Sequence, residues 1–194
     1  MPSGFDIIAL ASSAGGLKAL SEVLGALPAQ LPSALVVVQH LDPRHRSLMA
    51  DILGRRTAIR VREAVDGEVV RPGTAHIAPP DRHLLVNPDG SMSLTRTELV
   101  HFLRPSADLL FESVAASYRE RAIAVVLSGT GTDGSMGVKA IKKTGGTVIV
   151  QDQRSAEFSG MPEAAERTGM VDFILPLEEI AAALQTLVGA NGKP

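Results

Sequence analysis

The sequence Asp6-Ile7-Ile8-Ala9-Leu10-Ala11-Ser12-Ser13-Ala14-Gly15-Gly16 decides the fold class of this chain. Its first half, residues 6–11, is an apolar run after one aspartate, which is typical of a short buried β-strand. The two glycines open a segment in which leucines recur at helical spacing until Pro28, so we expect a helix there. A buried strand followed directly by a helix indicates a parallel α/β protein.

The same alternation of short apolar runs with helix-length segments continues through most of the chain. Further strands are expected at residues 35–38, 122–127, 147–150 and 172–174, and further helices at about 47–56, 106–118, 134–144, after Pro162 and at 177–187. The run at 35–38 is apolar throughout, as in strands that are buried on both faces. The sequence therefore predicts a doubly wound, mainly parallel sheet with helices on both faces.

Residues 59–97 depart from this rhythm because they contain no stretch with a helical period. Short strand-like pieces at 59–61, 75–78, 84–86 and 92–94 are separated by proline and glycine. Asn87-Pro88-Asp89-Gly90 is a strong turn sequence between the last two pieces. We therefore expect a small antiparallel extension of the sheet over about residues 59–97.

The composition bounds the kind of protein. A length of 194 residues with a hydrophobic fraction of 45% suits a single domain over residues 1–194, with a loose tail at 189–194. The sequence has no cysteine, which excludes disulfides, Cys-ligated zinc and a thiol nucleophile. A net charge of -2 and an aromatic fraction of 3% argue against nucleic-acid binding. Without a signal-peptide pattern or a span-length apolar run, we expect a cytoplasmic protein that does not insert into membranes.

Polar side chains follow three of the predicted strands at the point where each strand ends. Ser12 and Ser13 follow the first strand, and His40 follows the second. Asp133 stands in a glycine-rich loop after the strand at 122–127. Open α/β sheets bind ligands outside the carboxyl ends of their strands. The fold would therefore bring together a hydroxyl nucleophile, a histidine base and an acid that orients the histidine.

Ser13 is the preferred nucleophile of the two serines because it lies nearer to the start of the helix. Unpaired backbone N–H groups and the positive end of the helix dipole stabilise an oxyanion there. The small residues Ala14 and Gly15 permit a tight turn and the close approach of a substrate. The alternative is that a serine only caps the helix. A phosphate-binding loop is disfavoured, since neither a Gly-Lys-Ser/Thr ending nor a complete Gly-x-Gly-x-x-Gly is present here.

His40 also has two other interpretations. A lone histidine at a strand end is often only structural. His40, Asp42 and His45 together offer nitrogen and oxygen ligands for a metal ion within one short loop. No other part of the sequence repeats this pattern, and Pro43 lies within it, so we expect no metal site.

Asp133 lies between glycines in the segment 129–134. Its second interpretation is a helix cap or turn residue, a common role for aspartate. In the same loop, Thr130 and Gly131 are candidates to donate main-chain N–H groups to an oxyanion. The glycines indicate a backbone that passes close to another group.

Five motifs are spread along the chain. They are Ala11-Ser12-Ser13-Ala14-Gly15-Gly16, Val38-Gln39-His40, Arg104-Pro105-Ser106-Ala107-Asp108, the segment 127–134 and Ser159-Gly160-Met161-Pro162. In this order, over about residues 5–187, they resemble the catalytic domain of CheB-type chemotaxis protein-glutamate methylesterases. The resemblance implies a doubly wound, mainly parallel sheet with a small antiparallel extension. It also implies hydrolysis of γ-glutamyl methyl esters of receptors with release of methanol, glutamine deamidation in many members, and no cofactor.

Carried over motif by motif, the resemblance implies that Ser13 is the nucleophile, His40 the general base and Asp133 the orienting acid. The family's oxyanion donor, a main-chain N–H in the loop before the aspartate, falls on Thr130. The implied mechanism is acyl transfer: Ser13 forms a glutamyl-enzyme, methanol leaves, and water activated by His40 hydrolyses the intermediate.

The resemblance also implies partners. The substrates would be methylated chemoreceptor helices or helices of other receptors. The sequence does not contain the receiver domain of chemotaxis enzymes of this type, so regulation is expected from a separate receiver domain or methyltransferase. Two alternative functions are a non-catalytic regulatory module of a chemosensory system and an esterase or amidase with another substrate.

Overall fold

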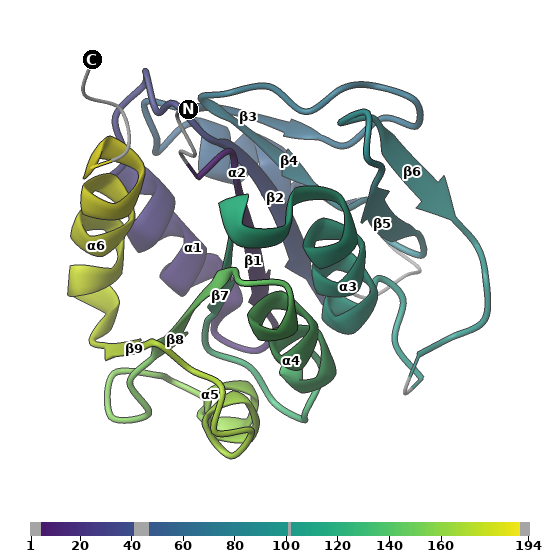
Figure 1. The fold of residues 1–194 in the computed structure, drawn as a ribbon. Coiled ribbons are helices and arrows are strands. Elements are labelled where there is room, and N and C mark those ends of the chain that lie inside the picture. The colour runs from purple at the N-terminus through teal and green to yellow at the C-terminus, as the bar shows by residue number, and fades with distance from the viewer. Residues whose placement is uncertain (1–4, 41–46, 101, 191–194) are drawn as a thin grey trace.

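The main sheet of the protein has seven strands. The structure, a computed structural model, describes residues 5–40, 47–100 and 102–190. The strands are β1 (Ile7–Ser12), β2 (Ala34–Gln39), β3 (Arg60–Glu63), β4 (Thr74–Ile77), β7 (Ala122–Val126), β8 (Thr147–Gln151) and β9 (Phe173–Leu175). Their order is β3-β4-β2-β1-β7-β8-β9, and each neighbouring pair is parallel (Figure 1).

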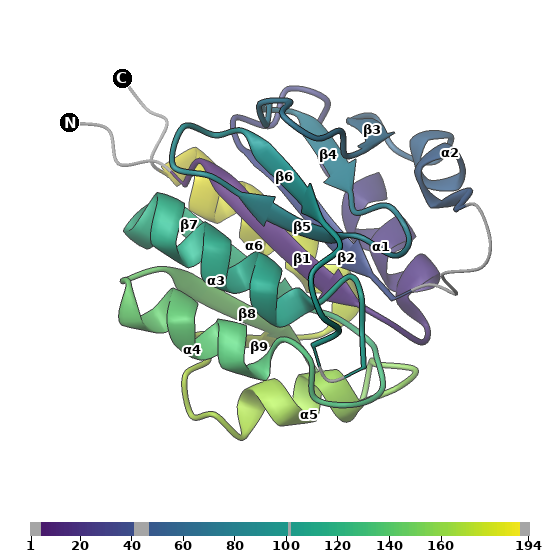
Figure 2. The ribbon, with the colours of Figure 1, turned by 90° about the vertical axis from the view of Figure 1, so that its right-hand side faces the viewer.

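Helices cover both faces of this sheet. They are α1 (Gly16–Gly25), α2 (Met49–Gly54), α3 (Ala107–Tyr118), α4 (Ser135–Lys143), α5 (Gly160–Glu166) and α6 (Leu177–Ala190), with a 3-10 turn η1 (Arg119–Arg121) after α3. Helices α1, α2 and α6 lie on one side, and α3, α4 and α5 lie on the other (Figure 2). The predicted doubly wound fold is confirmed.

The alternation of side chains along β1 explains why there are two cores. Ile7, Ala9 and Ala11 point into the core beneath α3 and α4. Ile8 and Leu10 point into the core beneath α1 and α6. Successive side chains of a strand face opposite sides, so a central strand with helices on both faces is apolar at nearly every position.

The expectation of an antiparallel extension over residues 59–97 is half wrong. The strands β3 and β4 belong to the main sheet and run parallel to β2. The antiparallel pair consists of β5 (His83–Val86) and β6 (Met92–Thr95), joined at the predicted turn, where the Gly90 N–H donates to the Asn87 carbonyl at 2.9 Å.

The physical reason is the connection between β3 and β4, which contains no helix. The segment 64–73 is tied instead to the β5–β6 hairpin, since the Val70 N–H donates to Gly90 and the Met92 N–H donates to Glu68. A parallel connection is usually recognised by its crossover helix, and that signal is absent here. The complete burial of β4, which has a neighbour on each side, fits a strand inside the sheet.

Helix boundaries differ from the expected ones at a few places. α5 begins at Gly160, so Pro162 lies in its first turn, where a missing N–H costs no hydrogen bond. α6 continues to Ala190, which is part of the tail expected to be loose. The rest of that tail, residues 191–194, lies outside the described residues. In the described part of the chain, every helix is too short or too polar to span a bilayer.

Candidate active site

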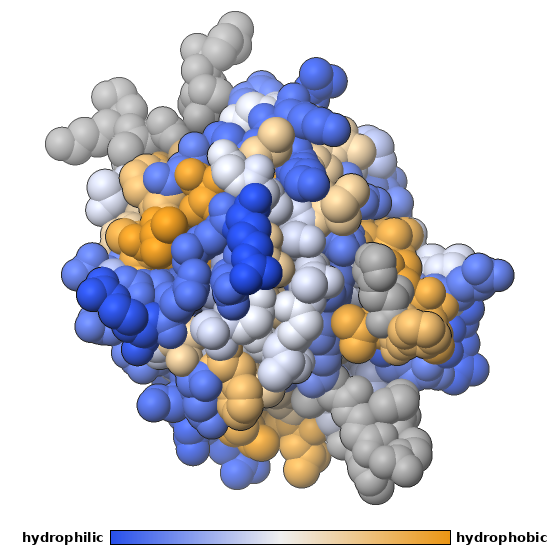
Figure 3. Space-filling model, turned by 90° about the horizontal axis from the view of Figure 1, so that it is seen from below, coloured by the Kyte–Doolittle hydropathy of each residue, from blue (hydrophilic) through white to orange (hydrophobic). Residues whose placement is uncertain are grey.

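Three loops meet at the carboxyl edge of the central strands. Ser12 is paired with Gln39 in the register of β1 and β2, so Ser13 and His40 leave neighbouring parallel strands side by side. The His40 N–H donates to the Ser12 carbonyl at 3.1 Å, and the Ser13 N–H donates to the Ser128 carbonyl at 3.0 Å. Figure 3 shows this edge, where residues of intermediate hydropathy lie between hydrophilic and hydrophobic regions.

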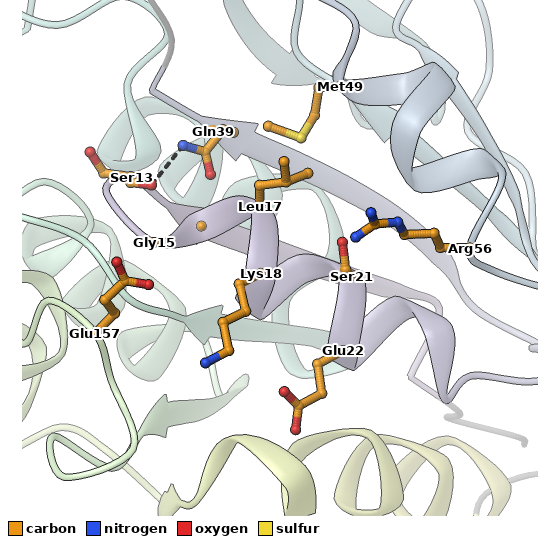
Figure 4. A pocket seen from close by; sticks show the side chains of 11 residues that line it. Ser13, Gly15, Leu17, Lys18, Ser21, Glu22, Gln39, Met49, Arg56 and Glu157 are labelled. Atoms are coloured by element: carbon orange, nitrogen blue, oxygen red, sulfur yellow. Dashed lines mark hydrogen bonds between the residues drawn. The ribbon is translucent and has the colours of Figure 1, made fainter.

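The two adjacent serines have different environments. The Ser12 side chain is fully buried, and its hydroxyl donates to the Gln39 side-chain oxygen at 2.6 Å. The Gln39 amide in turn donates to the carbonyl oxygens of Ser13 at 2.7 Å and His40 at 3.0 Å. Ser13 is only partly buried, and its hydroxyl points away from Gln39 (Figure 4). Ser13 is therefore the more accessible hydroxyl, and Ser12 belongs to the packing beneath it.

His40 and Asp133 are in direct contact across a separation of 93 residues in sequence. The His40 Nε2 atom lies 2.8 Å from Asp133 Oδ2. The His40 side chain is 12% exposed and the Asp133 side chain is fully buried. In this arrangement the carboxylate accepts a hydrogen bond from the imidazole Nε2–H and fixes the orientation of the ring. The other ring nitrogen, Nδ1, is then left to accept a proton from a reacting hydroxyl.

The Asp133 carboxylate is held by the start of α3. Oδ1 accepts from the Ser106 hydroxyl at 3.0 Å and from the Asp108 N–H at 3.0 Å. Oδ2 accepts from the Ala107 N–H at 2.6 Å in addition to the His40 contact. Burial alone would favour the neutral acid, but the hydrogen bonds from His40 and the two N–H groups outweigh it and lower the pKa of Asp133. The carboxylate is therefore ionised at neutral pH.

The glycine-rich loop passes directly beside Ser13. A Cβ atom on Gly129 would lie 3.0 Å from the Ser13 Cβ and 2.3 Å from the Met161 sulfur, so a larger residue does not fit there. The Met161 N–H donates to the Gly129 carbonyl at 2.8 Å, which links the loop to α5. The next two residues, Thr130 and Gly131, are exposed. The predicted oxyanion donors Thr130 and Gly131 therefore directly follow Gly129, the residue that lies against Ser13.

The turn from β1 into α1 is equally confined. Gly15 has a φ of +75°, and a Cβ atom there would lie 2.6 Å from the Ser128 hydroxyl. That hydroxyl donates to the Ala14 carbonyl at 2.8 Å. The turn through Ala14 and Gly15 therefore lies directly against the Ser128 loop.

An open groove of about 760 Å³ begins at Ser13 and continues along α1 (Figure 4). Leu17 and Met49 give it apolar lining, Lys18 and Arg56 add cationic groups, and Glu22 and Glu157 add carboxylates. Figure 4 places Leu17 and Lys18 on α1, Met49 on α2 and Arg56 at the end of α2. The groove is wide and partly apolar, which suits a segment of a protein better than a small, fully enclosed ligand.

The structure does not test the metal interpretation of His40, because Asp42 and His45, its other two candidate ligands, lie outside the described residues. Across residues 5–40, 47–100 and 102–190, no three His, Cys, Asp or Glu side chains converge as a metal site requires. The His40 Nε2 atom is occupied by Asp133.

Several supporting residues were not found by sequence reasoning. The sequence alone predicts no role for Gln39, although its side chain holds the backbone of both Ser13 and His40. It likewise predicts no role for Ser106 and Asp108, which contact Asp133 through a hydroxyl and an N–H. A signal existed for Ser106, a standard N-cap residue, but its partner lies 27 residues away and cannot be read locally.

Comparison with known proteins gives a consistent result. The family model described as CheB methylesterase matches residues 8–184. The protein-glutamate methylesterase/protein-glutamine glutaminase of Moorella thermoacetica is 40% identical over 193 residues, which cover 97% of this chain and 46% of that protein. The protein-glutamate methylesterase FrzG of Myxococcus xanthus is 38% identical over 187 residues, which cover 96% of this chain and 56% of that protein. The chain thus spans about half the length of these two relatives.

A solved structure has the same fold over nearly the whole chain. The crystal structure of the Thermotoga maritima CheB methylesterase catalytic domain has a TM-score of 0.91 to this structure at 35% sequence identity. The match covers 94% of this chain and 98% of that one. These names favour the methylesterase interpretation over a non-catalytic module. On the family model, the relatives and the structural match together, the chain belongs to the CheB methylesterase family.

Proposed function

We propose that this chain hydrolyses γ-glutamyl methyl esters of receptor proteins as a serine hydrolase, with Ser13, His40 and Asp133 as its triad. His40 Nδ1 accepts the Ser13 proton while the Ser13 oxygen attacks the ester carbonyl. Asp133 stabilises the imidazolium that forms. The imidazolium then protonates the departing methoxide, and methanol leaves. Water, deprotonated by His40, hydrolyses the glutamyl-enzyme and restores Ser13.

The oxyanion of each tetrahedral intermediate needs hydrogen-bond donors beside Ser13. We assign this role to the Thr130 N–H, with Gly131 in the same loop, because Gly129 approaches the Ser13 Cβ. The start of α1 after Gly15 directs a positive dipole end toward the same position. Neither assignment requires a cofactor.

The observation that carries the proposal is the contact between His40 and a buried, ionised Asp133 at the strand edge from which Ser13 emerges. Asp133 also caps the start of α3, but a helix cap alone does not call for an imidazole on the same carboxylate. The alternative for Ser13 is weakened because no side-chain cap hydrogen bond starts α1, whose N-cap residue is Gly15. The family relationship supports the same interpretation.

The substrate we infer is a receptor segment bound along the groove beside Ser13. The groove has room for several side chains around the ester, and its lining of apolar groups with charges of both signs fits an amphipathic segment. A triad of this kind also hydrolyses carboxamides, so deamidation of receptor glutamines is part of the proposal. Control by a separate receiver domain or methyltransferase stays a prediction. The family also supports a cytoplasmic location.

The test compares Ser13→Ala with Ser12→Ala in methanol release from methylated receptor. We expect Ser13→Ala to lose activity by at least about a thousandfold, since the nucleophile is gone. Ser12→Ala removes a hydroxyl buried beneath the site and should retain most of the activity. Labelling of Ser13 by a serine-reactive phosphonate provides a readout that needs no receptor. Equal loss in both variants, or no labelling of the folded wild type, would rule out the assignment.

A further inference from the structure

Asp108 is a buried carboxylate that the proposed mechanism does not use. It lies in the first turn of α3 and is 4% exposed. Its Oδ1 atom accepts the N–H of Gly134 at 3.0 Å and the N–H of Gly137 at 2.8 Å. Both donors belong to the start of α4, whose unpaired N–H groups need acceptors. Asp108 is therefore an N-terminal cap of a helix to which it does not belong.

Asp108 and Asp133 cap each other's helices. Asp133, directly before the N-cap residue of α4, accepts the N–H groups of Ala107 and Asp108 at the start of α3. Asp108, at the start of α3, accepts N–H groups at the start of α4. The two helices lie side by side (Figure 2), and a Cβ atom on Gly137 would lie 2.4 Å from the Cβ of Phe111. The two helix starts are thus locked together by reciprocal bonds.

The reciprocal bonds between α3 and α4 also fix the position of Asp133. Its carboxylate is held by α3, and the next peptide N–H, that of Gly134, is held by the Asp108 side chain from α3. Removal of Asp108 would leave two buried N–H groups without their acceptor. The loop that carries Asp133 would then be free to shift relative to His40.

Resting on the proposed function, we propose that Asp108 is a positioning residue, which keeps Asp133 in contact with His40 by capping α4. The acceptor oxygen matters here more than the negative charge. Burial raises the pKa of Asp108, the charges of Asp133 and Glu112 add to this rise, and the two N–H bonds oppose it. The negative charge on Asp108 is therefore disfavoured at this buried position, whereas its Oδ1 atom accepts two N–H groups.

The test separates acceptor from charge with two variants. Asp108→Asn retains an acceptor oxygen in the place of Oδ1, and Asp108→Ala removes it. We expect Asp108→Ala to lower kcat for ester hydrolysis about 10- to 100-fold with KM changed less than about twofold, because a misplaced triad acid weakens the chemistry and not the binding. The low-field proton NMR resonance of the His40 Nε2–H should broaden or vanish. Asp108→Asn should stay within about threefold of wild type and keep the resonance.

Glu112→Gln serves as the matched control, because it removes a carboxylate from an exposed position one turn along α3. All assays are run well below the melting temperature of each variant, and Asp108→Leu, which also has no side-chain acceptor, replaces Asp108→Ala if the alanine variant does not fold. An alanine variant with unchanged kcat and an unchanged resonance would overturn the proposal, as would equal losses in the asparagine and alanine variants. The resonance needs no substrate, so an inactive wild type would contradict the proposed function and leave the positioning test readable.

Discussion

At the scale of single residues, the site depends on the alternation of side chains at a strand end. Ser12 is the last residue of β1 and points into the interior, where Gln39 binds its hydroxyl. Ser13 is the first residue beyond the strand and stays partly exposed. Two identical side chains thus have opposite environments. The sequence favours Ser13 as the nucleophile because it lies nearer to the start of the helix. The burial of Ser12 and the partial exposure of Ser13 are an independent reason for the same choice.

Asp133→Asn should remove the orienting acid while leaving the fold in place. All four hydrogen-bond contacts of the carboxylate come from donors, so an amide NH₂ group must face at least one of them. It also cannot stabilise the imidazolium. We expect kcat to fall about 10³- to 10⁴-fold, measured as methanol release, with an unchanged circular dichroism spectrum.

The control for this prediction is Asp172→Asn, which changes an aspartate that pairs with Lys142 near the surface. It should leave kcat unchanged to within about twofold. An Asp133→Asn enzyme with more than a tenth of the wild-type kcat would show that His40 does not depend on this carboxylate.

At the scale of elements, the rhythm of strands and helices was predictable, because the central parallel strands β1, β2, β7 and β8 are buried on both faces and read as apolar runs. The location of Ser13, His40 and Asp133 at one edge of the sheet was predictable for the same reason, since each of them directly follows such a run or lies in the loop after it. The parallel course of β3 and β4 was not predictable, because the hairpin β5–β6 replaces a crossover helix in stabilising the segment between them. The supporting contacts of Asp133 were not predictable either, because they join residues from different helices.

Gly16→Ala tests the close contact between the start of α1 and the strand β2. A Cβ atom at this position would lie 1.8 Å from the Gln39 side-chain oxygen and 2.7 Å from the Ser12 hydroxyl. Gln39 must then move and release the carbonyl groups of Ser13 and His40. We expect a loss of about 1–3 kcal/mol in the free energy of unfolding, measured by urea denaturation, together with a lower kcat.

The comparison variant is Gly54→Ala at the end of α2. The nearest atom to a Cβ there is 3.8 Å away, an ordinary contact, and alanine favours a helix over glycine. This variant should be as stable as wild type or more so. If Gly16→Ala were equally stable and active, the contact with Gln39 would not constrain the site.

At the scale of the whole molecule, the main sheet contains a buried histidine that makes the stability depend on pH. His76 on β4 is 1% exposed, and burial, followed by the charge of Arg62, lowers its pKa from 6.5 to about 4. The unfolded chain therefore binds a proton at a higher pH than the folded chain does. As the pH falls from about 6.5 to about 4, the unfolded state gains protons first, and stability is lost.

The predicted loss from His76 is at most about 3 kcal/mol between pH 6.5 and pH 4. His76→Gln, which cannot be protonated, should flatten the dependence of the unfolding free energy on pH in this window. Urea denaturation at a series of pH values measures this slope for both proteins. The same slope in the variant and the wild type would show that other groups cause the loss of stability between pH 6.5 and pH 4.

The order of the sheet has a consequence for how activity reports on folding. Ser13, His40 and Asp133 follow β1, β2 and β7, the three adjacent strands at the centre of the sheet. The chain between His40 and Asp133 includes both outer strands on one side and the hairpin. A partly assembled chain that lacks any of the three central strands holds at most two of these groups in place. The ester turnover proposed for this chain would therefore be a chemical signature that the three central strands have assembled.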